Sequence, residues 1–130
     1  APPAWVFGPA WAVNNVSLLW GTLDLLNEPE DAPQRETLIA LQTLWWGVYA
    51  TFGYVSLRKN SPILSLAWTA ASLGLTVATT GISLQTGRDR LAVSQVTTLA
   101  WLTLATAVAA YQARANPDPL FGYEPPAEPA

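Results

Sequence analysis

Charged residues are confined to short segments that separate four long uncharged blocks of the chain. The uncharged blocks cover residues 1–23, 37–57, 62–87 and 91–113. Because about 20 mostly apolar residues suffice to cross the hydrocarbon core of a bilayer, each block is long enough to span it. The short connections make neighbouring helices antiparallel. The pattern therefore predicts an all-α integral membrane protein, an up-down bundle of four transmembrane helices. The predicted helices cover about 9–27, 37–57, 62–85 and 91–114.

A soluble four-helix bundle is the alternative to a membrane protein. The helices of a soluble bundle carry a polar stripe toward water, usually with Lys and Glu at helical spacing. The blocks at 62–87 and 91–113 are polar only through uncharged side chains such as Ser, Thr and Gln. A helix bundle in lipid can satisfy such groups internally. We therefore favour a multi-pass membrane protein.

Proline residues mark the expected limits of the bundle. Pro9 is predicted to begin the first helix, because proline is favoured in the first helical turn. We expect residues 1–114 to form the transmembrane bundle and residues 115–130 to form a proline-rich extended tail. Phe121 and Tyr123 are the side chains expected to pin this tail to the bundle.

Three missing residue types limit the chemistry of the chain. It contains no Cys, His or Met, which removes thiolate nucleophiles, the commonest general base and most side-chain ligands of haem iron. The net charge of −3 and the lack of a basic cluster argue against nucleic acid as a partner. We expect a protein that is not an enzyme, with no metal site and no required cofactor.

The basic residues leave the orientation in the membrane undecided. Cytoplasmic loops usually carry an excess of Lys and Arg. Each end of the predicted bundle has three such residues, Arg58, Lys59 and Arg114 at one end and Arg35, Arg88 and Arg90 at the other.

Tryptophan is several times more frequent than usual, with seven residues in the chain. A belt of aromatic residues at the membrane interface accounts for Trp5 and Trp20. Helical spacing places Trp11 and Asn15 on one face, and Gln42, Trp46 and Tyr49 on another. Converging faces of this kind would form an aromatic-walled cavity for a flat, largely apolar ligand. Simple core packing is the alternative.

Two further patterns concern helix packing. Ala70, Gly74 and Ala78 recur at every fourth position, a spacing that lets two helices approach closely. We slightly favour packing of this row inside the bundle over a homodimer seam. Polar residues within the predicted spans should point inward or lie at an interface, because they are costly against lipid. These residues are Asn14, Asn15, Gln42, Gln95 and Gln112.

The stretch from Trp5 to Trp11, Trp-Val-Phe-Gly-Pro-Ala-Trp after two prolines, resembles a family signature. It differs only at Ala10 from the pattern P-P-x-W-V-F-G-P-V-W that opens the second helix of the translocator proteins. This family is also called the tryptophan-rich sensory proteins (TspO/MBR) or peripheral-type benzodiazepine receptors. Residues 99–106, Leu-Ala-Trp-Leu-Thr-Leu-Ala-Thr, are similar to the last helix of the family.

The resemblance implies a bundle in which this chain begins at the second of five family helices. The chain differs from the family pattern at several pocket positions. Asn15 replaces a tyrosine, Thr97-Thr98 replaces Pro-Tyr, and Ala109 replaces an asparagine. The first hypothesis is therefore a translocator-like protein, and the second is a non-catalytic accessory subunit of a larger membrane complex.

Under the first hypothesis, the protein binds a hydrophobic planar ligand for transport or sensing. The resemblance suggests that this ligand is a porphyrin-type tetrapyrrole or a sterol-like lipid. Trp11, Trp46 and Trp101 would stack on this ligand, and Asn15, Gln42 and Tyr49 would make polar contacts. The expected partners are the bilayer, this ligand, and a second copy or a larger membrane complex. The expected location is the bacterial inner membrane.

Overall fold

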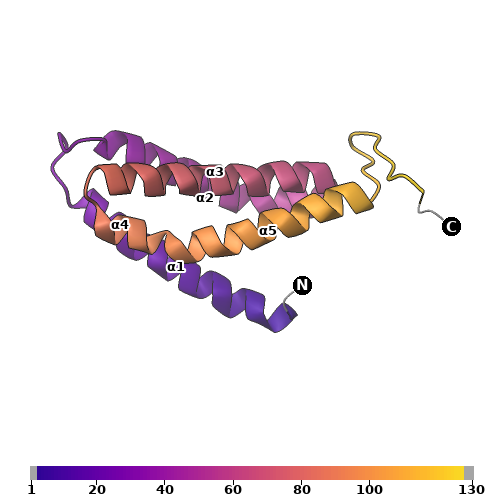
Figure 1. The fold of residues 1–130 in the computed structure, drawn as a ribbon, viewed down its shortest axis with the longest axis horizontal. Coiled ribbons are helices and arrows are strands. Elements are labelled where there is room, and N and C mark those ends of the chain that lie inside the picture. The colour runs from indigo at the N-terminus through magenta and orange to yellow at the C-terminus, as the bar shows by residue number, and fades with distance from the viewer. Residues whose placement is uncertain (1–2, 128–130) are drawn as a thin grey trace.

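The computed structural model describes residues 3–127, and these residues form helices without any strand of a sheet. The elements are α1 (Ala4–Leu26), α2 (Arg35–Arg58), α3 (Pro62–Gln85), α4 (Asp89–Ser94) and α5 (Val96–Ala115). In Figure 1, α2 and α3 lie side by side, α4 and α5 return along them, and α1 diverges from the bundle toward its N-terminus. The middle helix α3 packs against both α2 and α5, whereas α1 packs mainly against α4.

The first helix begins earlier than the sequence predicts. It starts at Ala4, and Pro9 lies inside it rather than at its beginning. Pro9 lacks the N–H that would bond to the Trp5 carbonyl. This loss falls in the second turn, close to a helix end, where few other hydrogen bonds depend on it.

The last predicted span is divided at Gln95 into α4 and α5. The hydroxyl of Ser17 on α1 donates to the backbone carbonyl of Ser94, at 2.8 Å. Gly21 lies one turn further along α1 and faces the side chain of Ser94. Because Gly21 has no side chain of its own, α1 and α4 can cross closely at this point. This contact occupies the Ser94 carbonyl at the point where the regular helix is interrupted.

Small polar residues line the buried face of α3. They are Thr69, Ser72, Thr76, Thr79 and Ser83. Four of their hydroxyls donate to backbone carbonyls one turn earlier in the same helix, namely those of Thr69, Ser72, Thr76 and Ser83. Four of these five hydroxyls are thus satisfied within α3, and the small size of the side chains lets α2 and α5 approach closely.

The surface of the bundle is unusually apolar. Exposed fractions reach 55% for Val77 and 62% for Leu84 on α3, and 58% for Leu44 on α2. Two helical segments, Pro62–Gln85 and Asp89–Ala115, are long and apolar enough to cross a membrane. Apolar side chains outside and small polar ones inside are the arrangement expected of a bundle in lipid. Spans at α1 and α2 stay a prediction.

The row of Ala70, Gly74 and Ala78 does not pack within the bundle. Ala70 and Gly74 are exposed, Ala78 is half-buried, and a Cβ added at Gly74 would meet no atom. The expectation of internal packing is wrong because the Ser and Thr face on the opposite side of α3 makes the helix contacts.

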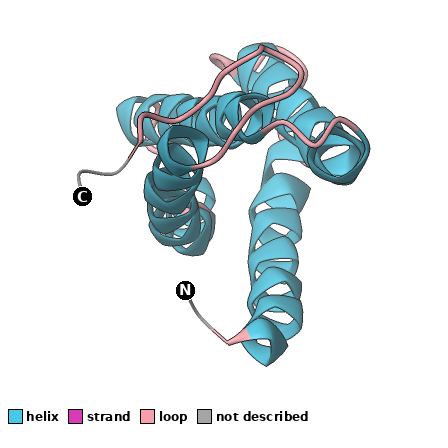
Figure 2. Cartoon of the chain, turned by 90° about the vertical axis from the view of Figure 1, so that its right-hand side faces the viewer, coloured by secondary structure: helices cyan, strands magenta, loops and turns pink. Residues whose placement is uncertain are grey.

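The chain after α5 folds back instead of remaining extended. Asp118 and Tyr123 exchange two backbone hydrogen bonds, which closes a tight turn with Gly122 at a φ of 67°. Phe121 is 56% exposed and does not pin the tail, whereas the Tyr123 hydroxyl donates to the Arg114 carbonyl. Figure 2 shows this segment crossing the end of the helical bundle.

Candidate ligand-binding site

Six aromatic side chains from α1, α2 and α5 form one connected cluster, which we name the aromatic cluster. Its members are Phe7, Trp11, Trp45, Trp46, Tyr49 and Trp101. The ring centroid of Trp11 lies 5.3 Å from that of Tyr49 and 6.0 Å from that of Trp101. Trp11 therefore joins the aromatic residues of α2 to the one on α5.

Polar groups lie beside these rings on the facing sides of α1 and α2. Asn15 Nδ2 donates to the Tyr49 hydroxyl at 3.3 Å. Gln42 Oε1 accepts from the Thr22 hydroxyl at 3.1 Å. Three buried polar atoms in the same region have no hydrogen-bond partner within residues 3–127, namely Asn15 Oδ1, Gln42 Nε2 and Trp45 Nε1. The site therefore holds two unused donors and one unused acceptor.

All six residues predicted for the site lie in or beside the aromatic cluster. Trp11, Trp46, Tyr49 and Trp101 are members of it. Asn15 contacts Tyr49, and Gln42 lies one turn before Trp46 and faces Thr22 of α1. Residues that share a face of α1 or of α2 in the sequence prediction thus contact the other helix in the structure.

Sequence reasoning missed Trp45. Its indole is 5% exposed and stacks on Tyr49, with centroids 5.4 Å apart and an interplanar angle of 11°. Trp46, its neighbour, is half-buried and meets the same ring edge-on. The available signal was the spacing of four between Trp45 and Tyr49, which places both on one face of α2.

An apolar cavity of about 190 Å³ adjoins the aromatic cluster. Phe7 and Trp101 of the cluster form part of its wall, and its other walls are Phe52, Ser65, Thr69, Leu104, Ala105, Val108 and Ala109. Pockets for drug-sized ligands usually measure about 300–1,000 Å³. A larger ligand would therefore need the walls to separate.

The N-terminal half of α1 is the wall with the fewest attachments. None of residues 4–13 is buried. Phe7 and Trp11 reach Trp101 and Tyr49 through ring contacts. Figure 2 shows this part of α1 standing apart from the other helices. Opening here costs ring contacts and no buried aliphatic packing.

The other polar residues of the predicted spans serve packing. Asn14 Oδ1 accepts from the hydroxyls of Thr97 and Thr98, and Gln95 Nε2 donates to the Ser94 hydroxyl. Gln112 is exposed near the end of α5. Among residues 3–127, no group of three acidic, His or Cys side chains is placed to hold a metal ion.

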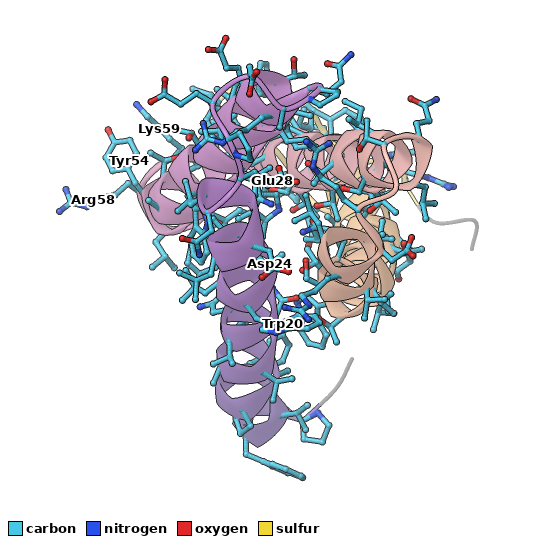
Figure 3. The ribbon with its side chains drawn as sticks, turned by 90° about the vertical axis from the view of Figure 1, so that its left-hand side faces the viewer. Trp20, Asp24, Glu28, Tyr54, Arg58 and Lys59 are labelled. Atoms are coloured by element: carbon cyan, nitrogen blue, oxygen red, sulfur yellow. The ribbon has the colours of Figure 1, made fainter. Side chains whose placement is uncertain are left out.

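Ion pairs tie α1 to the turn between α3 and α4. Arg88 Nε lies 3.0 Å from Glu28 Oε1, and Arg90 Nη1 lies 3.0 Å from Asp24 Oδ2. Arg88 also donates to the Pro33 carbonyl at 2.7 Å. Asp24 on α1 and Glu28 just after it are labelled in Figure 3, and Figure 1 shows this end of α1 opposite the C-terminal tail. These contacts secure the C-terminal half of α1.

Comparison with known families decides what this aromatic helical bundle is. The sequence model described as the TspO/MBR family matches residues 1–114. The chain belongs to the TspO/MBR family. Membership supports a membrane protein of the translocator or sensor type. The chain has no significant match among curated proteins or solved structures.

Two of the positions at which this TspO/MBR protein departs from the signature it resembles make hydrogen bonds between helices, one at the site and one outside it. Asn15 stands in place of a tyrosine and holds the Tyr49 hydroxyl of α2. Thr97 and Thr98 stand in place of Pro-Tyr and bind Asn14. Both replacements make helix-to-helix hydrogen bonds, so the local polarity differs from that of the family pattern.

Proposed function

We propose that this TspO/MBR protein binds a flat, largely apolar ligand against the aromatic cluster and acts in transport or sensing without catalysing a covalent step. A porphyrin-type tetrapyrrole is the first candidate and a sterol-like lipid the second. The unpaired buried atoms beside the cluster carry the proposal. An unpaired buried donor costs about 1–3 kcal/mol, so a protein that keeps several at one place gains from a ligand that pairs with them.

The composition of the cluster indicates the ligand's chemistry. Indole and phenol rings meet here at several angles, and such rings stack on flat apolar molecules. Gln42 Nε2 and Trp45 Nε1 are donors, so the polar edge of the ligand should carry an acceptor such as a carboxylate or carbonyl. Porphyrin propionates have this character.

The loosely attached half of α1 supplies a route to the site. We propose that it moves away from α2 and α5 when ligand enters, because a tetrapyrrole is larger than the cavity of about 190 Å³. The fixed C-terminal half would act as the base of this movement, since ion pairs of Asp24 and Glu28 hold it.

Titration with protoporphyrin IX tests the proposal. The purified chain in detergent should show saturable quenching of tryptophan fluorescence. Trp11→Ala and Trp46→Ala should each weaken binding by about tenfold, the cost of an aromatic contact together with lost apolar burial. Trp20→Phe is the matched control, because Trp20 lies outside the aromatic cluster and is 44% exposed. Linear, non-saturable quenching in the parent chain would refute ligand binding.

A second candidate function is an accessory subunit of a larger membrane assembly. The observation that favours it is the row of exposed Ala70 and Gly74 with half-buried Ala78, a face of α3 on which Gly74 has no neighbouring atom within residues 3–127. Gly74→Leu should abolish co-migration with a second copy or another subunit, and Gly53→Leu on α2 should not. Gly53 is likewise exposed with no atom near its Cβ position. Unchanged co-migration in Gly74→Leu would remove this face from consideration.

A further inference from the structure

Three cations lie without a carboxylate partner at the end of the bundle where α2 ends, α3 begins and α5 ends. They are Arg58 and Lys59 at the end of α2 and Arg114 in the last turn of α5. Within residues 3–127 no ion pair involves any of them. Lys59 Nζ instead lies 5.7 Å from the ring centroid of Tyr54. Arg58, Lys59 and Tyr54 project outward from the bundle in Figure 3.

The three cations at the opposite end are already engaged. Arg88 pairs with Glu28 and Arg90 pairs with Asp24. Arg35 donates to the carbonyls of Leu25 and Leu26 at the end of α1. The two ends have equal numbers of basic residues, yet only one of them presents its cations to an outside partner.

Large apolar and aromatic side chains are exposed at the same end as the unpaired cations. They are Tyr54 at 57%, Leu57 at 84%, Tyr111 at 68%, Leu120 at 50% and Phe121 at 56%. Leu120 and Phe121 form the tip of the turn that Asp118 and Tyr123 close. Near the opposite end, Leu23, Leu26 and Leu84 are also exposed, and Trp20 is the exposed aromatic residue described there, with Arg90 over its ring at 5.4 Å from the centroid. The two ends thus differ in exposed aromatic rings rather than in exposed aliphatic side chains.

The turn is held firmly against the bundle. Asp118 is fully buried and accepts from the Ser61 hydroxyl at 2.6 Å and from the Ile63 amide at 2.9 Å. These donors lie at the start of α3, and the Tyr123 hydroxyl reaches the end of α5. Because the carboxylate of Asp118 is enclosed, Glu124 is the exposed carboxylate at this end in the described chain. Within residues 3–127, three cations therefore face one exposed carboxylate at this surface.

We propose that this end, the cationic end, binds the headgroups of anionic phospholipids. It comprises Arg58, Lys59 and Arg114 together with Tyr54, Leu57, Tyr111, Leu120 and Phe121. Lipid phosphates complement the unpaired cations, and the headgroup region is where aromatic rings are most stable. An acidic soluble protein would complement the cations but leave this ring of apolar side chains in water.

Competition between two lipids tests the proposal. The full chain in detergent is incubated with equal amounts of phosphatidylglycerol and phosphatidylcholine of the same acyl chains, and bound lipids are counted by native mass spectrometry. We expect phosphatidylglycerol to be enriched by about fivefold for each contributing cation. The triple variant Arg58→Gln, Lys59→Gln, Arg114→Gln should lose the enrichment, and added salt should weaken it.

Matched variants and competitors separate the alternatives. Arg90→Gln removes one positive charge at the opposite end and should retain the enrichment. Lys59→Gln alone should lower it about fivefold, which keeps the test valid if the triple variant does not fold. Equal binding of both lipids, or an unchanged preference in these variants, overturns the proposal. Displacement of phosphatidylglycerol by inorganic phosphate or by polyglutamate also overturns it, in favour of a free-anion or acidic-protein site.

The absence of cysteine from the sequence allows a second readout. Leu120→Cys carrying an environment-sensitive fluorophore should shift its emission to the blue more strongly in vesicles with 30% phosphatidylglycerol than in pure phosphatidylcholine. Ala32→Cys, in the loop at the opposite end, should give the same emission in both. Equal emission of the Leu120 label in the two vesicles contradicts insertion of the turn at an anionic interface.

Discussion

Neighbouring identical residues take different roles on α2. Trp45 is buried with an unpaired indole N–H, whereas Trp46 is half-buried at the edge of the aromatic cluster. A helix turns by about 100° per residue, so the two indoles leave α2 in different directions. Trp45 is therefore the position where a stacking ring and an available donor coincide.

The first prediction separates these two properties of Trp45. Trp45→Phe keeps an aromatic ring against Tyr49 but removes the N–H. Loss of one hydrogen bond of about 0.5–1.5 kcal/mol should weaken protoporphyrin binding about threefold to tenfold. Trp68→Phe is the control, because the Trp68 indole already donates to Thr51 outside the cluster. Equal affinities of Trp45→Phe and the parent chain would mean that this donor does not contact the ligand.

The second prediction concerns Asp118 and acid. Burial raises the pKa of Asp118, but hydrogen bonds together lower it by more than burial raises it, so the pKa lies below the ordinary value of 3.8. The donors of these bonds are the Ser61 side chain and the backbone of Ile63, Phe121 and Leu120. A depressed folded pKa stabilises the closed turn fully above the unfolded pKa, and this contribution is lost as pH falls through the folded pKa. The turn should thus be insensitive to pH between about 5 and 8, and it should open only as the pH falls below the ordinary carboxyl value of 3.8 toward the depressed pKa of Asp118.

Hydrogen exchange measures this opening. The amides of Ile63, Leu64, Asp118, Phe121 and Tyr123, which are hydrogen-bonded in the turn, should lose protection in acid, while amides in the middle of α3 retain it. Asp118→Asn should exchange faster at neutral pH and lack the acid transition. Protection that persists unchanged in Asp118→Asn would show that the turn does not depend on this carboxylate.

At the scale of helices, close approach depends on where small residues face. α3 has two faces of small side chains, one of Ser and Thr and one containing Ala70 and Gly74. The Ser and Thr face is the buried one. Its hydroxyls can lie between helices because they donate to carbonyls of α3 itself. On α1, Gly21 has the same role against α4.

The third prediction tests that crossing. In Gly21→Ala the new Cβ would lie 2.6 Å from the Cβ of Ser94, so α1 and α4 must separate and the Ser17–Ser94 hydrogen bond weakens. Overpacking of this kind costs about 1–3 kcal/mol. The thermal unfolding midpoint in detergent should fall. Gly53→Ala, where no atom lies near the new Cβ, should leave it nearly unchanged. Equal midpoints for the two variants would argue against a close α1–α4 contact.

At the scale of the whole molecule, α1 is fixed at one end and loosely held at the other. Arg88 secures the fixed end, with a side chain only 9% exposed and contacts to Glu28, Thr86 and Pro33. Toward the N-terminus, ring contacts of Phe7 and Trp11 replace ion pairs. A ligand that enters between α1 and α2 therefore meets the less constrained half of the helix.

The fourth prediction distinguishes the two arginines at the fixed end. Arg88→Gln leaves Glu28 without its partner and should destabilise the chain by about 3–5 kcal/mol if the pair behaves as a buried one. Arg90→Gln breaks a pair in which both side chains are about half exposed and should cost less than about 1 kcal/mol. Denaturant unfolding of the parent, Arg88→Gln, Glu28→Gln and the double variant measures the coupling of this pair, and Arg90→Gln is measured beside them. Equal effects of the two arginine variants would contradict this difference.

The helical blocks, and the aromatic and polar residues that share a face, could be predicted from the sequence alone, because both depend on local periodicity. It placed Trp11 with Asn15 and Gln42 with Trp46 and Tyr49 through the helical repeat alone. Missing His, Cys and Met limited the chemistry in the same direct way. Signature residues from Trp5 to Trp11 were sufficient to suggest the family.

Only the tertiary structure decided which faces meet. Both small-residue faces of α3 satisfy the same local rule, and contact with α2 and α5 selects the one with Ser and Thr. Asp118 is buried through donors 57 and 55 residues away, which no local pattern indicates. The three basic residues at each end are equivalent in sequence, but ion pairs and carbonyl contacts engage only Arg35, Arg88 and Arg90. These outcomes depend on contacts between segments that are distant in the sequence. Such contacts form only in the folded chain, so no local pattern indicates them.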